Sequence, residues 1–296
     1  MSIIIDENTN VIVQGITGSE ASYWVEKMLD CGTNIVGGVT PGKSGQEVNG
    51  IPVYNSIESL KREHKTDLSV VFVPPKFTKG AAFEAIESGI ETIVLLADGV
   101  PLQDVLEIKN FAKINNTRVI GPNTPGIATL GSAMAGFIPF WLQDVYQAGN
   151  IGLMSRSGSL TNVISSKLKK HNLGLSTYIG VGGDPVPGTR FTEIIKLFEK
   201  DDETNLIIMV GELGGSMEQE VAQLVKEGLI TKPVLSYIAG EYAPEGKKMG
   251  HAGAIVNSDT GSVKAKNKIL KEAGIHIAKT PEEIGEKAKE LLGAKK

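Results

Sequence analysis

The chain has 296 residues, of which 41% are hydrophobic, 22% charged and 5% aromatic, and its formal net charge is −4. This balance is typical of a soluble globular protein of two ordinary domains. It excludes the basic surface that nucleic-acid binding needs, and no apolar run reaches the roughly 20 residues of a membrane span. A single cysteine, Cys31, excludes an internal disulfide and fits a reducing compartment. We expect a cytoplasmic enzyme without a signal peptide.

In the first part of the chain, short apolar runs alternate with segments of helical pattern. The apolar runs predict strands at 11–14, 34–39, 68–73, 92–96 and 118–120. The helical patterns between them lie at 20–30, 81–88 and 102–115. This alternation is typical of a parallel sheet with right-handed crossovers, because parallel neighbours need a long connection. We predict an α/β domain over residues 1–125.

The next segment interrupts this rhythm. Residues 127–147 show no regular pattern, and we predict a linker or lid over 126–145. The rhythm then returns, with strands predicted at 151–154, 175–181, 206–210, 233–238 and 275–278. Helices are predicted between and after them, at 160–171, 191–200, 218–227, 264–273 and 281–292. These elements predict a second α/β domain over 146–296.

A glycine-rich turn, Gly15-Ile-Thr-Gly18, joins the first predicted strand to the first predicted helix. Glycine lets a ligand approach the backbone, and a helix N-terminus attracts phosphate. The turn therefore predicts a phosphate cradle, although a tight turn without a ligand has the same pattern. A nicotinamide cofactor would need an acidic residue at the end of the second predicted strand, and that residue is missing here. Pro74 and Pro75 either flank an adenine ring or only end the third strand.

The loop after the second predicted strand carries a cation in place of that acid. Its sequence is Gly37-Gly-Val-Thr-Pro-Gly-Lys43. A lysine at this place suits a phosphorylated ribose, as in CoA or a phosphorylated dinucleotide. The alternative is that Lys43 is a solvated loop residue.

A histidine among small residues, in Gly250-His-Ala-Gly253, is the strongest local signal of chemistry. Imidazole is nucleophilic near neutral pH and can carry a phosphoryl group covalently. Small neighbours leave room for that group on the ring. We therefore predict a phosphohistidine at His251, against the alternative of an ordinary core or surface histidine.

Two loops that follow predicted strands would complete such a site, because carboxyl-end loops of a parallel sheet meet in one crevice. Ser155-Arg-Ser-Gly-Ser159 precedes a helix and offers backbone N–H groups to a phosphoryl oxygen. Arg156 adds charge there or forms a structural ion pair. Gly211-Glu-Leu-Gly-Gly215 places Glu212 to accept a hydrogen bond from the ring, unless Glu212 is an exposed loop residue.

Seven motifs, in this order and spread over essentially the whole chain, resemble the α subunit of succinyl-CoA synthetase. They are Gly15-x-Thr-Gly18, Gly37–Lys43, Gly121-Pro-Asn123, Ser155-Arg-Ser-Gly158, Gly182-Gly-Asp184, Gly211–Gly215 and Gly250–Gly253. The resemblance implies an N-terminal Rossmann-like CoA-binding domain followed by a flavodoxin-like ligase domain. It implies that His251 is phosphorylated, with Glu212 as its partner. It also implies that ATP and Mg²⁺ bind to a larger partner subunit of ATP-grasp fold.

The turns and loops described above, together with the seven motifs, predict the binding residues. The phosphoryl group of His251 is expected to contact Ser155, Arg156, Ser157, Gly158 and Ser159. CoA is expected to contact Gly15, Thr17, Gly18, Ser19, Lys43, Val73, Pro74 and Asn123. No metal-binding residue is expected in this chain. One position departs from the family pattern, because Ala21 stands where succinyl-CoA synthetases usually have glycine.

The identity of the acid is predicted from a second resemblance. Four stretches are more similar to ATP-citrate lyase than to succinyl-CoA synthetase, at 159–162, 187–191, 226–233 and 265–274. The chain stops at Lys296, and we expect no citrate-synthase-like domain that would cleave citryl-CoA. We therefore predict the small subunit of a citryl-CoA synthetase, which converts ATP, citrate and CoA to ADP, phosphate and citryl-CoA. The alternatives are a succinyl-CoA or malyl-CoA synthetase, a CoA-sensing or NAD-sensing regulator, and a nicotinamide dehydrogenase.

Overall fold

The computed structural model describes residues 3–243, 250–256 and 261–293. The chain forms two compact units. The first unit contains Ile4–Ile138 together with Val186–Gly188. The second unit contains Pro139–Pro185 and the described residues from Thr189 onward. Within the described residues, no helix is long and apolar enough to cross a membrane.

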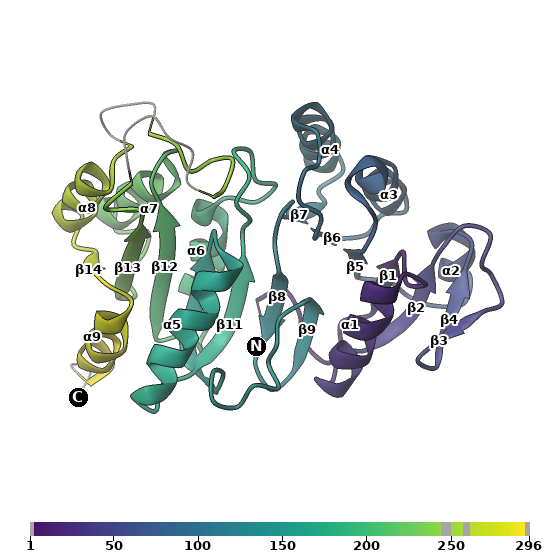
Figure 1. Ribbon diagram of the computed structural model, residues 1–296, viewed down its shortest axis with the longest axis horizontal. Coiled ribbons are helices and arrows are strands. Elements are labelled where there is room, and N and C mark those ends of the chain that lie inside the picture. Colours follow the sequence, from purple (N-terminus) through teal and green to yellow (C-terminus); the bar gives the residue numbers. More distant parts are fainter. Residues whose placement is uncertain (1–2, 244–249, 257–260, 294–296) are drawn as a thin grey trace. The chain divides into compact units, whose positions relative to one another are not determined.

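A sheet with strand order β3-β4-β2-β1-β5-β6-β7 forms the centre of the first unit (Figure 1). Its strands are β1 (Val11–Gln14), β2 (Ile35–Val39), β3 (Glu47–Val48), β4 (Ile51–Tyr54), β5 (Leu68–Val71), β6 (Thr92–Leu95) and β7 (Arg118–Ile120). All neighbours are parallel except β3 and β4. From β4 to β7 this is the Rossmann strand order. Successive strands are added to one side of β1 and then, starting with β5, to its other side. A reversal of this kind opens a crevice at the carboxyl ends of the two strands.

The helices of the first unit are α1 (Ser19–Asp30), α2 (Ile57–Lys61), α3 (Pro75–Glu87) and α4 (Leu102–Ile114). Apolar residues of α2, α3 and α4 share one core with the sheet. Helix α3 begins at Pro75, six residues before the predicted start, because proline fits the first helical turn, where its missing N–H is not needed. The sequence analysis missed α2, which is only five residues long and is held by a capping box at Ser56.

The prediction of an irregular linker or lid over 126–145 is wrong for its first part. Strands β8 (Gly126–Thr129) and β9 (Ala133–Gly136) form an antiparallel hairpin within the first unit. Gly126 and Gly136 face each other with φ of 108° and 139°, and a Cβ on either would overlap the backbone of the other strand. The hairpin thus depends on glycine and alanine, which have low strand propensity and therefore hide it from pattern reading.

The second unit contains a parallel run of strands in the order β14-β13-β12-β10-β11 (Figure 1). These are β10 (Ala148–Ser155), β11 (Leu175–Gly180), β12 (Leu206–Glu212), β13 (Val234–Ala239) and β14 (His276–Ala278). The helices are α5 (Gly158–Lys170), α6 (Phe191–Lys200), α7 (Met217–Lys226), α8 (Val263–Glu272) and α9 (Glu282–Gly293). Helices α5 and α9 lie on one face of these strands, and α6, α7 and α8 lie on the other.

This order is that of a flavodoxin-like sheet, so the predicted α/β fold class is confirmed for both units. The order in which successive strands are added to the sheet reverses between β10 and β12, which are parallel neighbours. Ser155 ends β10 and Glu212 ends β12. The two strands are direct neighbours, with Ser155 opposite Val210. The fold therefore brings the loops after Ser155 and Glu212 to the same crevice.

Candidate functional site

The turn after β1 approaches another part of the backbone closely. Gly15 has a φ of +83°, and a Cβ at this position would overlap the carbonyl oxygen of Phe72. Its N–H donates to the carbonyl oxygen of Val39, 2.7 Å away. Gly18 ends the turn as the N-cap of α1, and its N–H donates to the Gly15 carbonyl oxygen at 3.0 Å. Glycine at position 15 is thus required by the approach of two strands, and the turn presents the N-terminus of α1 to the crevice.

A cavity of about 360 Å³ lies beside this turn. It is lined by Gly18, Ser19, Glu20, Ala21, Val71, Phe72, Val73, Pro74, Leu96, Ala97 and Phe137. The lining combines the N-terminus of α1, which suits a phosphate group, with apolar side chains, which suit a flat ring. It includes four of the residues predicted to bind CoA, namely Gly18, Ser19, Val73 and Pro74. Phe137 was not predicted, because it comes from the segment after the missed hairpin.

The other four predicted CoA contacts do not line this cavity: Gly15, in the turn beside it, and Thr17, Lys43 and Asn123. Thr17 Oγ1 lies 3.3 Å from Thr40 Oγ1, which holds the loop carrying Lys43 beside the turn. Lys43 is exposed in that loop. Asn123 has a φ of 56° and donates its backbone N–H to the carbonyl oxygen of Ala97 at 2.9 Å. Lys43 and Asn123 are therefore placed around the crevice rather than in its wall. Ala21, the departure from the family pattern, is buried and lines the cavity.

Replacing Gly15 with Ala is expected to destabilise the first unit by at least about 2 kcal/mol, because it adds backbone strain to a steric overlap. Gly99→Ala is the matched control, since Gly99 has a φ of +75° with open space around it. It should cost only the strain, about 1 kcal/mol. Urea unfolding of both variants gives the comparison. Equal losses of stability would contradict a role for the Phe72 overlap.

The ring of His251 lies beside two charged side chains of the second unit. Its Nδ1 lies 2.7 Å from Oε2 of Glu212, at the end of β12. The other carboxylate oxygen, Oε1, lies 3.1 Å from Nη2 of Arg156. Arg156 is only 3% exposed and also donates to the carbonyl oxygen of Asp184 at 3.3 Å. The imidazole is therefore not sealed in apolar packing: 29% of its side chain is exposed, and its orientation is set by Glu212.

Electrostatics at this site favour the protonated ring. The hydrogen bond to Glu212 is the largest effect and raises the pKa of His251 above its ordinary value. Burial and the charge of Arg156 lower the pKa, while the charge of Asp184 raises it. Because Nδ1 points at a carboxylate, the neutral ring carries its proton on Nδ1. The neutral tautomer therefore leaves the lone pair of Nε2 available as a nucleophile.

The predicted phosphate-binding loop lies between β10 and α5. Ser157 is the N-cap of α5, and its Oγ accepts from the N–H of Leu160. Ser155 is fully buried, and its Oγ accepts from the N–H of Ser157 at 3.0 Å. Gly158 and Ser159 form the first turn of α5, where the helix dipole is positive. Of the five predicted residues, Arg156 contacts Glu212, whereas Ser157, Gly158 and Ser159 form the start of α5 and Ser155 ends β10.

Several residues that shape this site were not assigned a role from the sequence. A Cβ on Gly183 would overlap the ring of His251, and one on Gly253 would overlap Nη2 of Arg156. The motifs that contain these glycines were noted in the sequence. Neither motif alone shows that each glycine makes room for a side chain from a loop distant in sequence. Lys266 and Glu218 were missed entirely, because each is one charged residue in an amphipathic helix.

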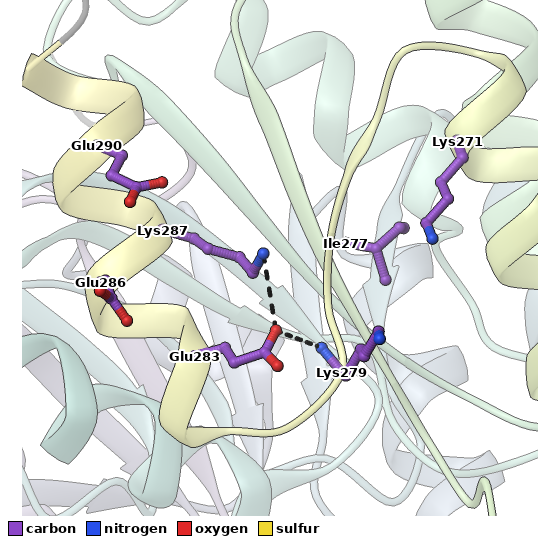
Figure 2. Close-up of a pocket in the computed structure, with 7 residues that line it drawn as sticks. All are labelled: Lys271, Ile277, Lys279, Glu283, Glu286, Lys287 and Glu290. Atoms are coloured by element: carbon purple, nitrogen blue, oxygen red, sulfur yellow. Dashed lines mark hydrogen bonds and ion pairs between the residues drawn. The ribbon is translucent and has the colours of Figure 1, made fainter.

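A further pocket lies between α8, β14 and α9 (Figure 2). Seven residues line it: Lys271, Ile277, Lys279, Glu283, Glu286, Lys287 and Glu290. Glu283 accepts from the backbone N–H of Lys279 at 3.0 Å and pairs with Lys287 at 3.7 Å. The charges of this pocket thus largely compensate one another, and none of its lining residues belongs to the site around His251.

Comparisons with known proteins agree with this architecture. Residues 6–99 match the CoA binding domain family, and residues 154–288 match the CoA-ligase family. The chain is 49% identical to an ADP-forming sulfoacetate-CoA ligase subunit of Bilophila wadsworthia, covering 99% of this chain and 100% of that protein. It is 43% identical to the α 1 subunit of an ADP-forming succinate–CoA ligase of Archaeoglobus fulgidus, covering 99% of each.

A solved structure has the same fold over nearly the whole chain. It is the ATP citrate lyase of Methanothrix soehngenii in complex with citrate and coenzyme A, with a TM-score of 0.89 and 25% identity. The match covers 99% of this chain and 51% of that one, so this chain spans about half the length of the lyase. The two family matches and the full-length relatives identify this chain as a member of the ADP-forming CoA ligase family, similar to the α subunits of succinyl-CoA synthetase.

Proposed function

We propose that this chain is the CoA-binding and phosphohistidine-carrying subunit of an ADP-forming acid–CoA ligase, and that it acts together with a larger ATP-grasp subunit. The observation that carries the proposal is the 2.7 Å contact between His251 Nδ1 and Glu212, which leaves Nε2 as the nucleophile. Relatives that match over their full length are named as subunits of such ligases, which supports the need for a partner.

In the proposed reaction, Nε2 of His251 attacks the γ-phosphorus of ATP, which the partner subunit holds with Mg²⁺. An N–P bond forms, the bond to the bridging oxygen breaks, and ADP leaves with the electron pair. The proton stays on Nδ1, where Glu212 stabilises the positive charge that develops on the ring. Arg156 and the N-terminus of α5 offer positive charge to the phosphoryl oxygens.

The phosphoryl group then passes from Nε2 to the carboxylate of the acid, which forms an acyl phosphate and regenerates neutral His251. The thiolate of CoA attacks the acyl carbon, a C–S bond forms, and phosphate leaves. The first unit is proposed to bind CoA with the N-terminus of α1 and the apolar wall at Val73, Pro74 and Phe137, which fit a phosphate and an adenine ring.

For the acid, we propose sulfoacetate, which the name of a 49% identical, full-length relative carries. Citrate is the second candidate, because it was predicted from the sequence and a structure of similar fold binds citrate and coenzyme A. Succinate is the third, supported by a relative that is 43% identical. Sulfoacetate, citrate and succinate are all small acids with at least two negative charges.

The test is a reconstitution of this chain with the proposed larger ATP-grasp subunit. CoA-dependent release of ADP is measured with sulfoacetate, citrate, succinate and malate at equal concentrations. We expect kcat/KM for sulfoacetate to exceed that for the other acids by at least about tenfold, a difference of about 1.4 kcal/mol in transition-state binding. A preference for citrate would overturn the choice of acid and leave the ligase chemistry standing. Absence of ADP release with every acid would contradict the ligase assignment.

A further inference from the structure

A lysine is completely buried next to the strand end that carries Glu212. Lys266, on α8, has an exposed fraction of 0%. Its Nζ donates to the carbonyl oxygen of Glu212 at 2.9 Å, to the carbonyl oxygen of Gly214 and to Oε2 of Glu218. An ammonium group has three N–H donors, and here each of the three has an acceptor. Two of these acceptors belong to the loop that starts with Glu212.

Glu218, in the first turn of α7, holds the same strand end from the other side. It is also 0% exposed. Its Oε2 accepts from Lys266, while its Oε1 accepts from the backbone N–H of Glu212 at 3.2 Å. A Cβ on Gly211 would overlap Oε1 of Glu218, so this glycine admits the carboxylate. The ion pair therefore binds both backbone polar groups of Glu212.

The fixed loop packs against the segment that follows His251. Gly214 has a φ of +81°, and its N–H donates to the carbonyl oxygen of Gly261 at 2.8 Å. A Cβ on Gly214 would overlap the carbonyl oxygen of Ile255. The same ammonium group thus fixes the backbone of Glu212 and the contact surface of the histidine loop. A displacement of either would change the 2.7 Å contact between Glu212 and the ring.

Stability alone is a poor explanation for this ion pair. Burial lowers the pKa of Lys266, which shows that removing its charge from water is unfavourable. Buried ion pairs can often be replaced by apolar side chains without loss of stability. A fully buried pair that contacts the backbone of the residue orienting the nucleophile is better explained by positioning.

We propose that Lys266 and Glu218 are positioning residues that hold the Glu212 carboxylate in hydrogen-bonding distance of His251. The inference rests on the proposed function of His251 as a phosphoryl carrier. It predicts that loss of the pair weakens the orientation of the ring without affecting the CoA-binding unit.

The test uses the double substitution Lys266→Met/Glu218→Met, which removes both charges and retains much of the side-chain volume. Three quantities are measured: the rate of His251 phosphorylation by ATP in the reconstituted complex, the CoA affinity, and the pKa of His251 by NMR in the full chain. The matched control is Lys167→Met/Glu282→Gln, which removes a more exposed ion pair of 3.0 Å between α5 and α9.

For the double substitution, we expect the phosphorylation rate to fall at least about tenfold, while CoA affinity stays within about twofold. We expect the pKa of His251 and the acid limb of the pH–rate profile to move to lower pH, because Glu212 is the main group that raises this pKa. The other charged groups near the ring, Arg156 and Asp184, are unchanged in the variant. The control should keep the wild-type rate and profile.

A wild-type rate with an unmoved pH profile in the double variant would overturn the inference. If the wild-type chain takes no phosphoryl group, the proposed function fails, and the pKa of His251 in the two proteins still decides whether the pair positions Glu212. If the double variant does not fold, Glu218→Gln gives the same readouts, because it keeps the side-chain shape and removes the charge. The same downward shift supports the inference, and an unmoved pKa overturns it.

Discussion

Replacing His251 with Asn is expected to reduce phosphoryl transfer to this chain by at least about 1,000-fold, because asparagine has no nucleophilic nitrogen. The reconstituted complex is incubated with ATP labelled at the γ-phosphate, in the absence of acid and CoA. Acid-labile, alkali-stable label on this chain is then measured. Label without the acid would also support ATP, rather than an acyl phosphate, as the donor to Nε2.

His276→Asn is the matched control for this experiment. His276 is exposed at the start of β14, opposite Leu235, and within the described residues it forms no hydrogen bond or ion pair with His251, Glu212 or Arg156, so this variant should be labelled at the wild-type rate. Binding of CoA should be unchanged in both variants, because the cavity with CoA-binding features belongs to the first unit. Acid-labile label that survives in His251→Asn would remove the basis of the proposed function.

Replacing Glu212 with Gln is expected to slow phosphorylation of His251 by about 100-fold or more. Two physical effects contribute. The amide loses the negative charge that stabilises a positive ring, and its NH₂ group can donate to Nδ1. Donation to Nδ1 favours the tautomer with the proton on Nε2, which removes the nucleophilic lone pair.

The pH dependence of the same variant has a defined sign. In the wild-type chain, Glu212 raises the pKa of His251, so the nucleophile is lost as the pH falls through this raised value. In Glu212→Gln the pKa falls, and the acid limb of the pH–rate profile moves to lower pH. Glu220→Gln on α7 is the control, since Glu220 pairs with Arg190 at 2.6 Å and not with the ring. An acid limb that stays in place in Glu212→Gln would contradict the assignment of Glu212.

Strand and helix periodicity predicted most of the regular elements, and α6 was predicted at its observed bounds. The exceptions have different physical causes. The β8–β9 hairpin consists mainly of glycine, alanine and other small residues, and its strands are specified by close backbone contact rather than by propensity. Helix α2 and strand β3 are too short for a periodic pattern. Strand β4 was also missed, since a proline at position 52 interrupts its apolar run. Val186–Gly188 belongs to the first unit. The side chain of Lys109 donates a hydrogen bond to the carbonyl oxygen of Pro187, and the N–H of Gly188 donates to the carbonyl oxygen of Gly121; no local pattern predicts these contacts.

The sequence by itself determined the α/β class and the order of the two units, and it supplied the candidate site residues, because periodicity and glycine-flanked motifs are local properties. Only the tertiary structure decided that the carboxylate of Glu212 contacts both the guanidinium group of Arg156 and the ring of His251. It also decided that Lys266 and Glu218 hydrogen-bond to the backbone of Glu212. These contacts join residues up to 56 positions apart, Arg156 and Glu212 being the most distant pair, and depend on the reversal of strand order between β10 and β12. Strand order is set by the packing of the whole sheet, which no short segment of the chain encodes.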